Sequence, residues 1–235
     1  MRCVIRVDDA GWTHEESARP PIKKPDPGLR LAQRFHAAMG GLPYLAGVIG
    51  AAIDEDGAAW LATKPTGLIP AVHGWDHGAK KPAERDEFYG KVGAEVRDRI
   101  AATRRVIGPT PHLIPPYNAA SDELLVPAWH EGIRYVWGQE SAWPTPPQPY
   151  RRGPMWFVPA WAPLYGGSTF RQGAAPSILD TVESGVLDLP GTAVATLHIP
   201  WEAARHPDFD GVKRLVERLH SHALHPDEFV AEACP

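Results

Sequence analysis

Short apolar segments that end abruptly at polar residues recur along this chain, and they limit its possible folds more than any other feature. Each is long enough for one strand, and most are followed by apolar residues at helical spacing. The six segments are residues 3–7, 44–49, 68–72, 112–114, 133–137 and 194–197. Strands that alternate with helices form mainly parallel sheets. We therefore predict an α/β fold: a distorted or incomplete (β/α) barrel of about seven parallel strands in a single domain, residues 1–235.

The segments between the strands carry the expected helical patterns. Apolar residues recur at helical spacing over residues 31–39, where a Gly-Gly pair ends the pattern. The strongest amphipathic pattern covers about residues 84–107 and stops at a Gly-Pro pair; its charged face is predicted to be ordinary solvent surface. Further helices are predicted over residues 121–131 and 212–219.

Proline and tryptophan are unusually frequent and indicate long structured loops. The chain has 26 prolines, 22 glycines and nine tryptophans. Regular elements tolerate few prolines or glycines, so loops must carry much of the chain. Residues 140–173 are predicted to form one long ordered loop, with at most one strand near residues 155–158. Many indoles in a loop-rich protein indicate a cleft that stacks flat rings.

Charge and cysteine content narrow the possible partners and location. The 235-residue chain has a formal net charge of -4 and a pI of about 6.2, which favours a small-molecule substrate over nucleic acid or an anionic membrane. The first seven residues are too short and too charged for a secretory signal, and no apolar run reaches membrane-spanning length, so we expect a cytoplasmic location. Cys3 and Cys234 lie outside any metal-binding or redox spacing, and no disulfide framework is expected.

Four polar clusters directly follow predicted strands. In a parallel barrel the carboxyl ends of the strands converge on one rim, so residues distant in sequence become neighbours there. The clusters are Asp8-Asp9, His73 with His77, Pro116-Tyr117-Asn118, and His198. We therefore place the candidate site at this rim.

His73 and His77 are candidate metal ligands. Their separation lets both imidazoles face one ion if the segment turns helically, and Asp9 would complete three protein ligands, as in catalytic zinc sites. Taken alone, such a histidine pair more often consists of polar side chains on the surface, and adjacent aspartates often cap turns or helices. Adjacent strand residues point in different directions, however, so Asp9 can bind a metal while Asp8 acts as a base.

The clusters also follow the order of a known set of motifs. The segments are Val7-Asp8-Asp9, His73-Gly74-Trp75-Asp76-His77, Ile114-Pro115-Pro116-Tyr117 and Leu197-His198. They resemble the motifs of the polysaccharide deacetylase (NodB homology) family, which are a strand-end Asp-Asp, a His-x-x-x-His, an Arg-x-Pro-aromatic and a late Leu-His. The resemblance spans nearly the whole chain.

The resemblance implies distinct roles for the two aspartates. Asp8 would be the general base, whereas Asp9, His73 and His77 would hold a divalent metal. The metal would lower the pKa of its water and polarise the acyl oxygen. Zinc is the default, although ligands of this kind also accept cobalt, nickel or iron.

The later motifs would complete the reaction. By the same resemblance, His198 would be the general acid that protonates the departing amine. The turn at Pro116 and Tyr117 would supply a backbone N–H to the oxyanion, and the adjoining Asn118 is expected on the substrate side.

One position departs from the family pattern. Ile114 stands where the family has an arginine that neighbours the catalytic aspartate and helps to set its charge. The charge of Asp8 is therefore expected to depend on the metal and on burial. No clear fourth-motif aspartate orients His198, although Asp188 and Glu202 are candidates. The chain resembles a divergent branch of the family, and the effect of the missing arginine on activity is left open.

Tryptophans adjoin several of the motifs. Trp12, Trp75 and Trp201 are predicted to form apolar walls for a sugar ring. Three others are expected to fill the core or its edges: Trp60, Trp129 and Trp137.

The sequence thus predicts a metal-dependent carbohydrate N-deacetylase, which removes an N-acyl group, expected to be acetyl, from a sugar or sugar-like molecule. A metal-dependent amidase acting on a non-sugar amide is the alternative enzyme. A catalytically silent sugar-binding barrel is the alternative from another class, but pure binding needs neither the base Asp8 nor the acid His198. The sequence does not determine the oligomeric state.

Overall fold

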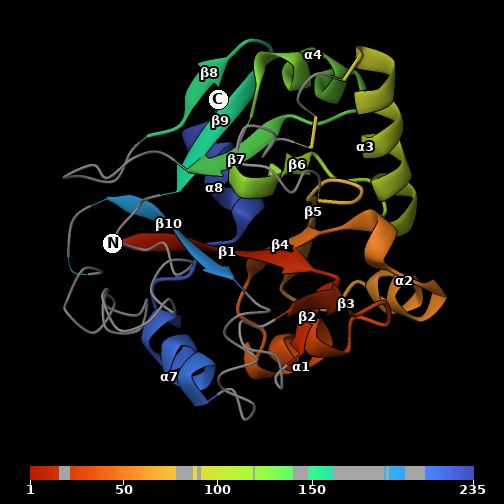
Figure 1. Ribbon diagram of the computed structural model, residues 1–235. Coiled ribbons are helices and arrows are strands. Elements are labelled where there is room, and N and C mark those ends of the chain that lie inside the picture. Colours follow the sequence, from red (N-terminus) through yellow and green to blue (C-terminus); the bar gives the residue numbers. More distant parts are fainter. Residues whose placement is uncertain are drawn as a thin grey trace.

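The computed structural model describes residues 1–15, 22–77, 87–88, 91–118, 120–139, 148–160, 188, 191–198 and 210–235. Its centre is one curved sheet in the strand order β10-β1-β4-β5-β6-β7-β9-β8 (Figure 1). The strands are β1 (Arg2–Ala10), β4 (Tyr44–Val48), β5 (Leu68–Val72), β6 (His112–Leu113), β7 (Tyr135–Gln139), β8 (Tyr150–Arg152), β9 (Met155–Ala160) and β10 (Thr192–His198).

The pairing confirms the predicted α/β architecture. In the described part of this sheet, the seven strands from β10 through β9 pair in parallel, and β8 is antiparallel, as a hairpin partner of β9. Among the described residues β9 and β10 share no ladder, so the described sheet is not closed into a full barrel. A short antiparallel pair, β2 (Trp12–Glu15) and β3 (Ile22–Pro25), extends from the end of β1 where a polar loop was expected.

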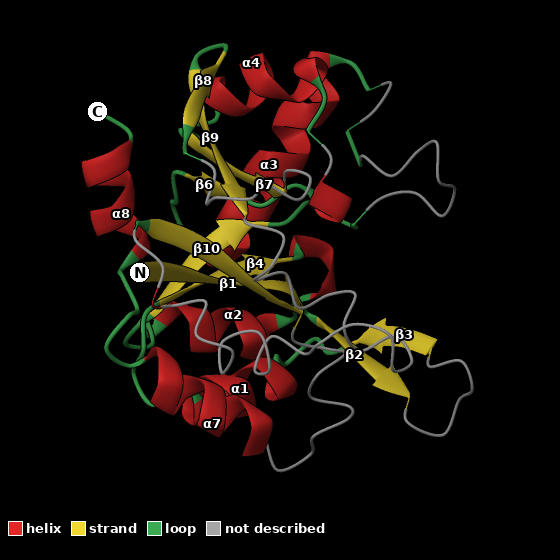
Figure 2. Cartoon of the chain, turned by 90° about the vertical axis from the view of Figure 1, so that its left-hand side faces the viewer, coloured by secondary structure: helices red, strands yellow, loops and turns green. Residues whose placement is uncertain are grey.

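Helices cover the outside of the barrel, and one lies across its end. α1 and α7 lie below β1 and β4, and α3 and α4 lie beside β5 to β7 (Figures 1 and 2). The helices are α1 (Arg30–Ala38), α2 (Glu55–Ala62), α3 (Gly93–Ile107), α4 (Asp122–His130), α7 (Asp210–Leu219) and α8 (Pro226–Ala233), with the 3₁₀ turns η1 (Gly50–Ala52) and η3 (Pro116–Asn118). None of the described helices combines the length and apolar character needed to cross a membrane.

The barrel interior is a layer of apolar side chains to which all seven parallel strands or their ends contribute. The layer also receives four side chains from α8 and the residues that flank it, so α8 closes the amino-terminal end of the barrel. Its members are Val4, Leu45, Ala71, Ile114, Trp137, Val158, Ala160 and Val194 with Leu224, Phe229, Val230 and Cys234. On β1, residues of the same parity as Val4 also face inward, which places Arg6 and Asp8 above this layer.

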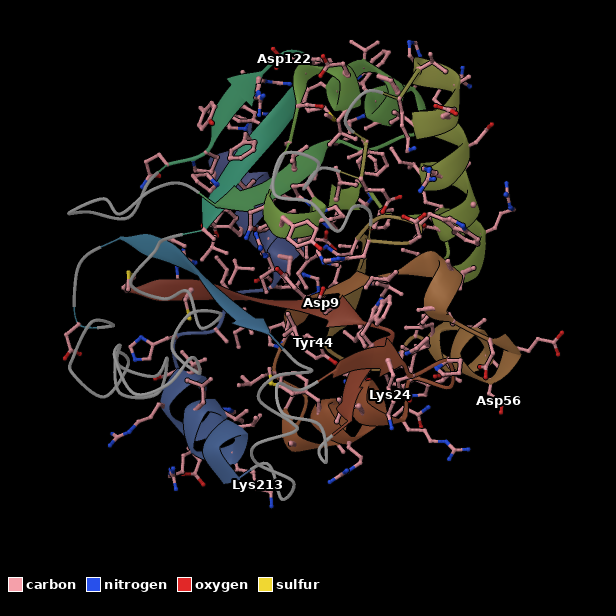
Figure 3. The ribbon with its side chains drawn as sticks, viewed as in Figure 1. Asp9, Lys24, Tyr44, Asp56, Asp122 and Lys213 are labelled. Atoms are coloured by element: carbon pink, nitrogen blue, oxygen red, sulfur yellow. The ribbon has the colours of Figure 1, made fainter. Side chains whose placement is uncertain are left out.

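The opposite faces of the strands pack against the helices. Phe35 of α1 and Leu215 of α7 contact the outward side chains of β1 and β4 in one buried cluster. A second cluster joins β5 to β9 with α2, α3 and α4. The two cysteines, Cys3 and Cys234, are buried and unpaired. Asp9 lies in the middle of the molecule in Figure 3, whereas Asp56, Asp122 and Lys213 lie near its edges.

Several element boundaries differ from the sequence predictions. The helix expected from about residue 84 begins only at Gly93, where Glu95 accepts a hydrogen bond from the Val92 N–H. Glu87 lies before the helix and is buried, so its predicted place on a solvent-exposed helix face is wrong. α2 and α8 were not predicted; α2 is capped by Asp54, whose side chain accepts from the Gly57 N–H.

Candidate metal centre and active site

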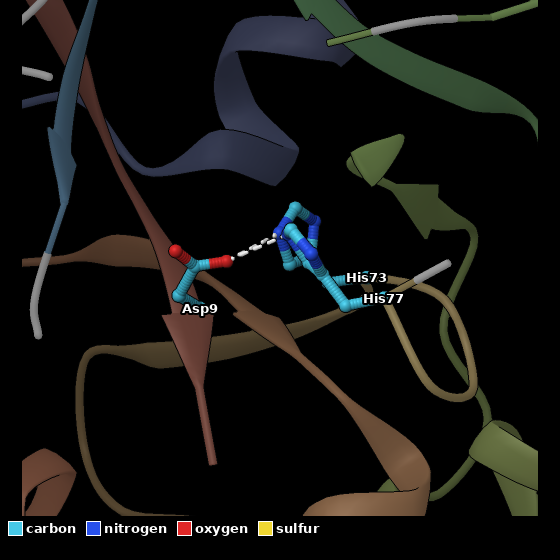
Figure 4. Close-up of side chains that lie close together, drawn as sticks. All are labelled: Asp9, His73 and His77. Atoms are coloured by element: carbon cyan, nitrogen blue, oxygen red, sulfur yellow. Dashed lines mark hydrogen bonds and ion pairs between the residues drawn. The ribbon is translucent and has the colours of Figure 1, made fainter. Parts of the chain in front are cut away.

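Asp9, His73 and His77 converge at the carboxyl ends of β1 and β5, which β4 separates in the sheet. Asp9 is the last residue but one of β1, and His73 directly follows β5. The carboxylate Oδ1 of Asp9 lies 3.1 Å from Nε2 of His73 and 2.9 Å from Nε2 of His77 (Figure 4). One potential ligand atom from each residue lies within 4.8 Å of the others, and all three residues are buried. This arrangement is compatible with a divalent metal.

Local backbone irregularity produces this convergence. The pairing of β1 with β4 shifts register between Val7 and Ala10, and Asp9 within the shift has a φ of 65°. His77 has a φ of 64°. Left-handed conformations are uncommon for residues other than glycine, and they persist where the surroundings enforce them. Both residues therefore take orientations that a regular strand or helix would not give.

The charges at the triad fit a cation. His73 Nδ1 lies 2.8 Å from the carbonyl oxygen of Ile114, which can only accept, so Nδ1 carries a proton. Nε2 is then left facing the Asp9 carboxylate. Burial alone lowers the pKa of His73, but the hydrogen bond with Asp9 and the charges of Asp8 and Asp9 outweigh it and raise that pKa. The surroundings of His73 therefore favour positive charge beside Asp9. Two imidazoles and one carboxylate form the donor set of catalytic zinc sites.

Asp8 is paired with an arginine that sequence reasoning missed. Arg6 is fully buried, and its Nε and one terminal nitrogen bind Oδ1 and Oδ2 of Asp8 at 2.9 and 2.8 Å. Its other N–H groups reach the side-chain oxygen of Asn118 and the backbone oxygens of Trp137 and Gly138. All five guanidinium donors can thus be satisfied.

The charge of Asp8 was expected to depend on the metal and on burial, but the structure adds a third influence, the guanidinium of Arg6. The arginine missing at Ile114 has a counterpart on β1 itself, and Ile114 instead packs inside the barrel. The sequence did carry a signal for this pair. Residues i and i+2 of a strand face the same side, so Arg6 and Asp8 on one strand could be expected to be neighbours.

The turn at Pro116, Tyr117 and Asn118 lies beside the triad. Tyr117 and Asn118 both have positive φ, 55° and 59°. The ring of Tyr117 lies 4.7 Å from that of His77, centroid to centroid, and the residue is 47% exposed. Tyr117 therefore presents an accessible aromatic face next to the triad, and Asn118 ties the turn to Arg6.

Solved structures share this architecture. An acetyl xylan esterase of family 4 from Clostridium thermocellum, solved with a cobalt ion, is 15% identical, with a TM-score of 0.58 over 98% of this chain and 90% of that one. A protein described as a polysaccharide deacetylase from Pseudomonas aeruginosa PAO1 is 12% identical, with a TM-score of 0.65 over 98% and 89%. The chain has the polysaccharide deacetylase fold.

That fold is shared with other activities. An allantoinase, Puue, is 12% identical, with a TM-score of 0.65 over 97% of this chain and 88% of that one. No protein-family model matches the chain, and no curated protein matches it in sequence. At these identities the likeness establishes the fold, so the chemistry has to be argued from the site.

The structure describes only some of the remaining site residues predicted from the sequence. The backbone of His198 pairs in register with Asp8 across β10 and β1, but the side chain of His198, and Trp201 and Glu202, lie outside the described residues. Asp188 is described only as an isolated residue.

The described tryptophans differ in burial and in surroundings. Trp12 is half-buried at the start of β2, and its indole N–H has no partner among the described residues. Trp75 is half-buried in the loop between the two histidines, where its ring fills the space left by the missing side chain of Gly50. Trp137 is fully buried in the barrel, as predicted. Trp129 is 39% exposed on α4 and is covered by the guanidinium of Arg134.

Proposed function

We propose that this protein is a metal-dependent hydrolase that removes an N-acyl group, acetyl in the first instance, from a sugar or sugar-like small molecule. One observation carries the proposal: the buried triad of Asp9, His73 and His77 lies next to a second carboxylate, Asp8, that Arg6 holds in place. A metal-binding site alone needs only the triad. A hydrolytic site also needs a base beside it, and Asp8 fits that role.

The metal contributes one part of the chemistry. A divalent ion held by the triad, with zinc as our first choice, supplies Lewis-acid chemistry, since it polarises an acyl carbonyl and makes water more acidic. Asp8 accepts the proton that the attacking water loses. The bidentate pair with Arg6 fixes the plane of the carboxylate and favours its charged form before the proton arrives.

Two further groups complete the proposed mechanism. The backbone N–H of Tyr117 donates to the oxygen that becomes negative in the tetrahedral intermediate. His198 donates a proton to the departing nitrogen; support for this role comes from the register of its backbone with Asp8. An amine leaves far more readily once protonated, so an amide substrate requires such an acid.

The substrate class follows from the accessible part of the site. The exposed ring of Tyr117 beside His77 offers a flat apolar face of the kind that stacks on a sugar ring. Trp12, Trp75 and Trp201 are proposed as further walls. A small-molecule substrate in the cytoplasm, without nucleic acid or membrane partners, remains our working proposal.

The proposal is tested by loading the protein with zinc or cobalt, measuring bound metal, and following acetate release from N-acetyl sugars, O-acetyl sugars and simple acetamides. Release from the N-acetyl sugars above the other classes is expected. Release mainly from O-acetyl sugars would make the protein an esterase, and release mainly from non-sugar amides would make it an amidase. A metal-free protein inert on all three classes would refute the hydrolase and leave a binding barrel.

A further inference from the structure

Glu87 is a buried carboxylate that the proposed chemistry does not use. It follows the loop of residues 73–77 in the chain, and its side chain is 0% exposed. Burying a carboxylate is costly unless hydrogen bonds and a counter-charge offset the loss of water. The position of this group next to the metal-binding loop therefore calls for a physical reason.

The contacts of Glu87 are with the loop itself. Its Oε1 accepts a hydrogen bond from the backbone N–H of Trp75 at 2.7 Å and another from Arg99 of α3 at 3.2 Å. Arg99 also binds the carboxylate of Asp76 at 2.9 Å. Glu87 thus holds the backbone of the loop at Trp75, whereas Arg99 contacts the loop through the half-exposed side chain of Asp76.

The second carboxylate oxygen of Glu87 is packed against Gly74. A Cβ added at Gly74 would lie 1.9 Å from Oε2, far inside van der Waals contact. Gly74 also has a φ of 79°, a conformation that side chains disfavour. The glycine of the His-Gly-Trp-Asp-His segment and Glu87 are therefore fitted to each other.

The rest of the loop backbone is tied to the barrel. The His73 N–H donates to Val48 O at 2.9 Å, Thr103 Oγ1 donates to Gly74 O at 2.9 Å, and the Ala51 N–H donates to Trp75 O at 2.7 Å. Glu87 adds the acceptor for the Trp75 N–H, two residues before His77. Since His77 has a left-handed backbone, its orientation depends on how firmly the preceding residues are held.

We propose that Glu87 is a positioning residue for the metal centre: by fixing the backbone at Gly74 and Trp75, it aims His77 at the ion without contacting the ion. The inference rests on the metal site of the proposed function. It adds a group that orients a ligand through the backbone, and partners that orient ligands strongly affect metal affinity.

The pKa of Glu87 reflects the cost of burying its carboxylate. Burial raises the pKa of Glu87, and the nearby charge of Asp76 adds to this; the Trp75 N–H and Arg99 act in the opposite direction but do not outweigh them. The carboxylate of Glu87 thus lies at a position where loss of water disfavours its charged form. An apolar residue there would avoid the desolvation, but it would leave the Trp75 N–H without this acceptor.

Metal affinity is the direct test. Zinc and cobalt dissociation constants of the full chain would be measured by competition with a chelator for wild type, Glu87→Ala and Glu87→Gln, with the visible cobalt spectrum as a report on ligand geometry. Glu87→Ala is expected to weaken binding by about 10–100-fold and to alter the spectrum. Glu87→Gln keeps an oxygen that accepts from the Trp75 N–H, so its affinity should stay near wild type.

Asp76→Asn is the matched control. Asp76 is in the same loop and binds the same Arg99, but its side chain is 48% exposed, so its affinity for metal should be close to wild type. The thermal midpoint of each metal-free variant separates positioning from general stability. If Glu87→Ala lowers that midpoint while metal affinity is unchanged, Glu87 is only structural and the proposal fails.

A second set of variants guards against misfolding of Glu87→Ala. Gly74→Ala should also weaken metal binding, because its methyl group displaces Glu87. In the Gly74→Ala, Glu87→Ala double variant the loss should be smaller than the sum of the two single losses, since the collision is gone; strictly additive losses would overturn the coupling. A wild-type protein that binds no metal would overturn the proposed function and this inference together, whereas wild-type affinity in Glu87→Ala would overturn this inference alone.

Discussion

At the residue scale, two adjacent aspartates are held by different partners. Asp9 faces His73 and His77, whereas Asp8 is clamped by Arg6. The register shift in β1 is what separates them, because it turns Asp9 out of the regular alternation of the strand. Neighbours in sequence can therefore have independent functions, and substitutions should separate these.

Asp9→Asn should remove metal and activity together. A neutral amide oxygen is a poorer ligand for a divalent cation than a carboxylate, and one of three protein ligands is affected. Metal content after dialysis against a mild chelator is the measurement. A variant that kept a full equivalent of metal would show that Asp9 is not a ligand.

Asp8→Asn should keep the metal and lose turnover. Removal of a general base typically lowers the rate by about 10²–10⁴-fold, and the triad is untouched by the change. The rate constant for acetate release would be compared with metal content in the same preparation. Loss of metal from this variant, with retention in Asp9→Asn, would exchange the two roles.

Arg6 is expected to couple strongly with Asp8. Arg6→Met leaves the Asp8 carboxylate buried without its counter-charge, a change that costs about 3–5 kcal/mol of unfolding free energy. The Arg6→Met, Asp8→Asn double variant should be less destabilised than Arg6→Met alone, because the uncompensated charge is gone. Urea denaturation of the three variants and wild type gives the coupling energy, and a value near zero would contradict the buried pair.

At the element scale, α8 was not predicted but closes the barrel. Phe229 and Val230 complete the interior layer, and Asp227 at the start of the helix accepts a hydrogen bond from buried His112 at 2.9 Å. The other ring nitrogen of His112 accepts from the indole N–H of Trp137. His112 therefore donates through Nε2, and α8 is anchored to β6 and β7 by this chain of bonds.

The contact between His112 and Asp227 predicts a specific pH dependence. The hydrogen bond from His112 lowers the pKa of Asp227 below its ordinary value of 3.8, although burial acts against it. A depressed folded pKa stabilises the protein above the unfolded value, and this contribution is lost as pH falls through the folded pKa. Asp227→Asn should therefore cost about 0.5–1 kcal/mol near neutral pH, since Asp227 is partly exposed.

The difference between Asp227→Asn and wild type should shrink below about pH 4, as measured by urea denaturation at several pH values. Glu228→Gln changes the neighbouring exposed carboxylate of the same helix and serves as the control. A deficit for Asp227→Asn that persisted unchanged in acid would mean that the charge of Asp227 is not involved.

At the scale of the whole molecule, the site is separate from the packing that holds the barrel together. The triad lies at the carboxyl ends of the strands, and the apolar interior layer lies below it. Replacing a metal-binding side chain of the triad should therefore leave the fold intact. It should, however, remove any stabilisation that comes from metal binding to the folded state alone.

Zinc at 100 times its dissociation constant should stabilise the wild-type protein by about 2.7 kcal/mol, seen as a rise in the thermal midpoint. His73→Ala and His77→Ala should keep a cooperative transition in the absence of metal and lose most of this rise. Calorimetry with and without chelator measures both quantities. An equal rise in wild type and both variants would place the bound metal elsewhere.

The sequence by itself determined the class of fold and the positions of the polar clusters. Apolar runs of strand length, alternating with helical periodicity, allow few arrangements other than a parallel sheet covered by helices. The polar residues after residues 7, 72 and 197 were located for the same reason, because each ends a run whose side chains must be buried. These patterns are local, so they can be recognised from the sequence alone.

Only the tertiary structure decided how the clusters are connected. The pairing of Arg6 with Asn118, the burial of Glu87 against Gly74, and the closure of the barrel by α8 each join segments that are distant in sequence or irregular in backbone. Periodicity predicts that the segment around Glu87 is amphipathic, but not which neighbours bury the carboxylate of Glu87. That choice depends on contacts made after the chain has folded, where an unsatisfied buried charge costs more than any local propensity supplies.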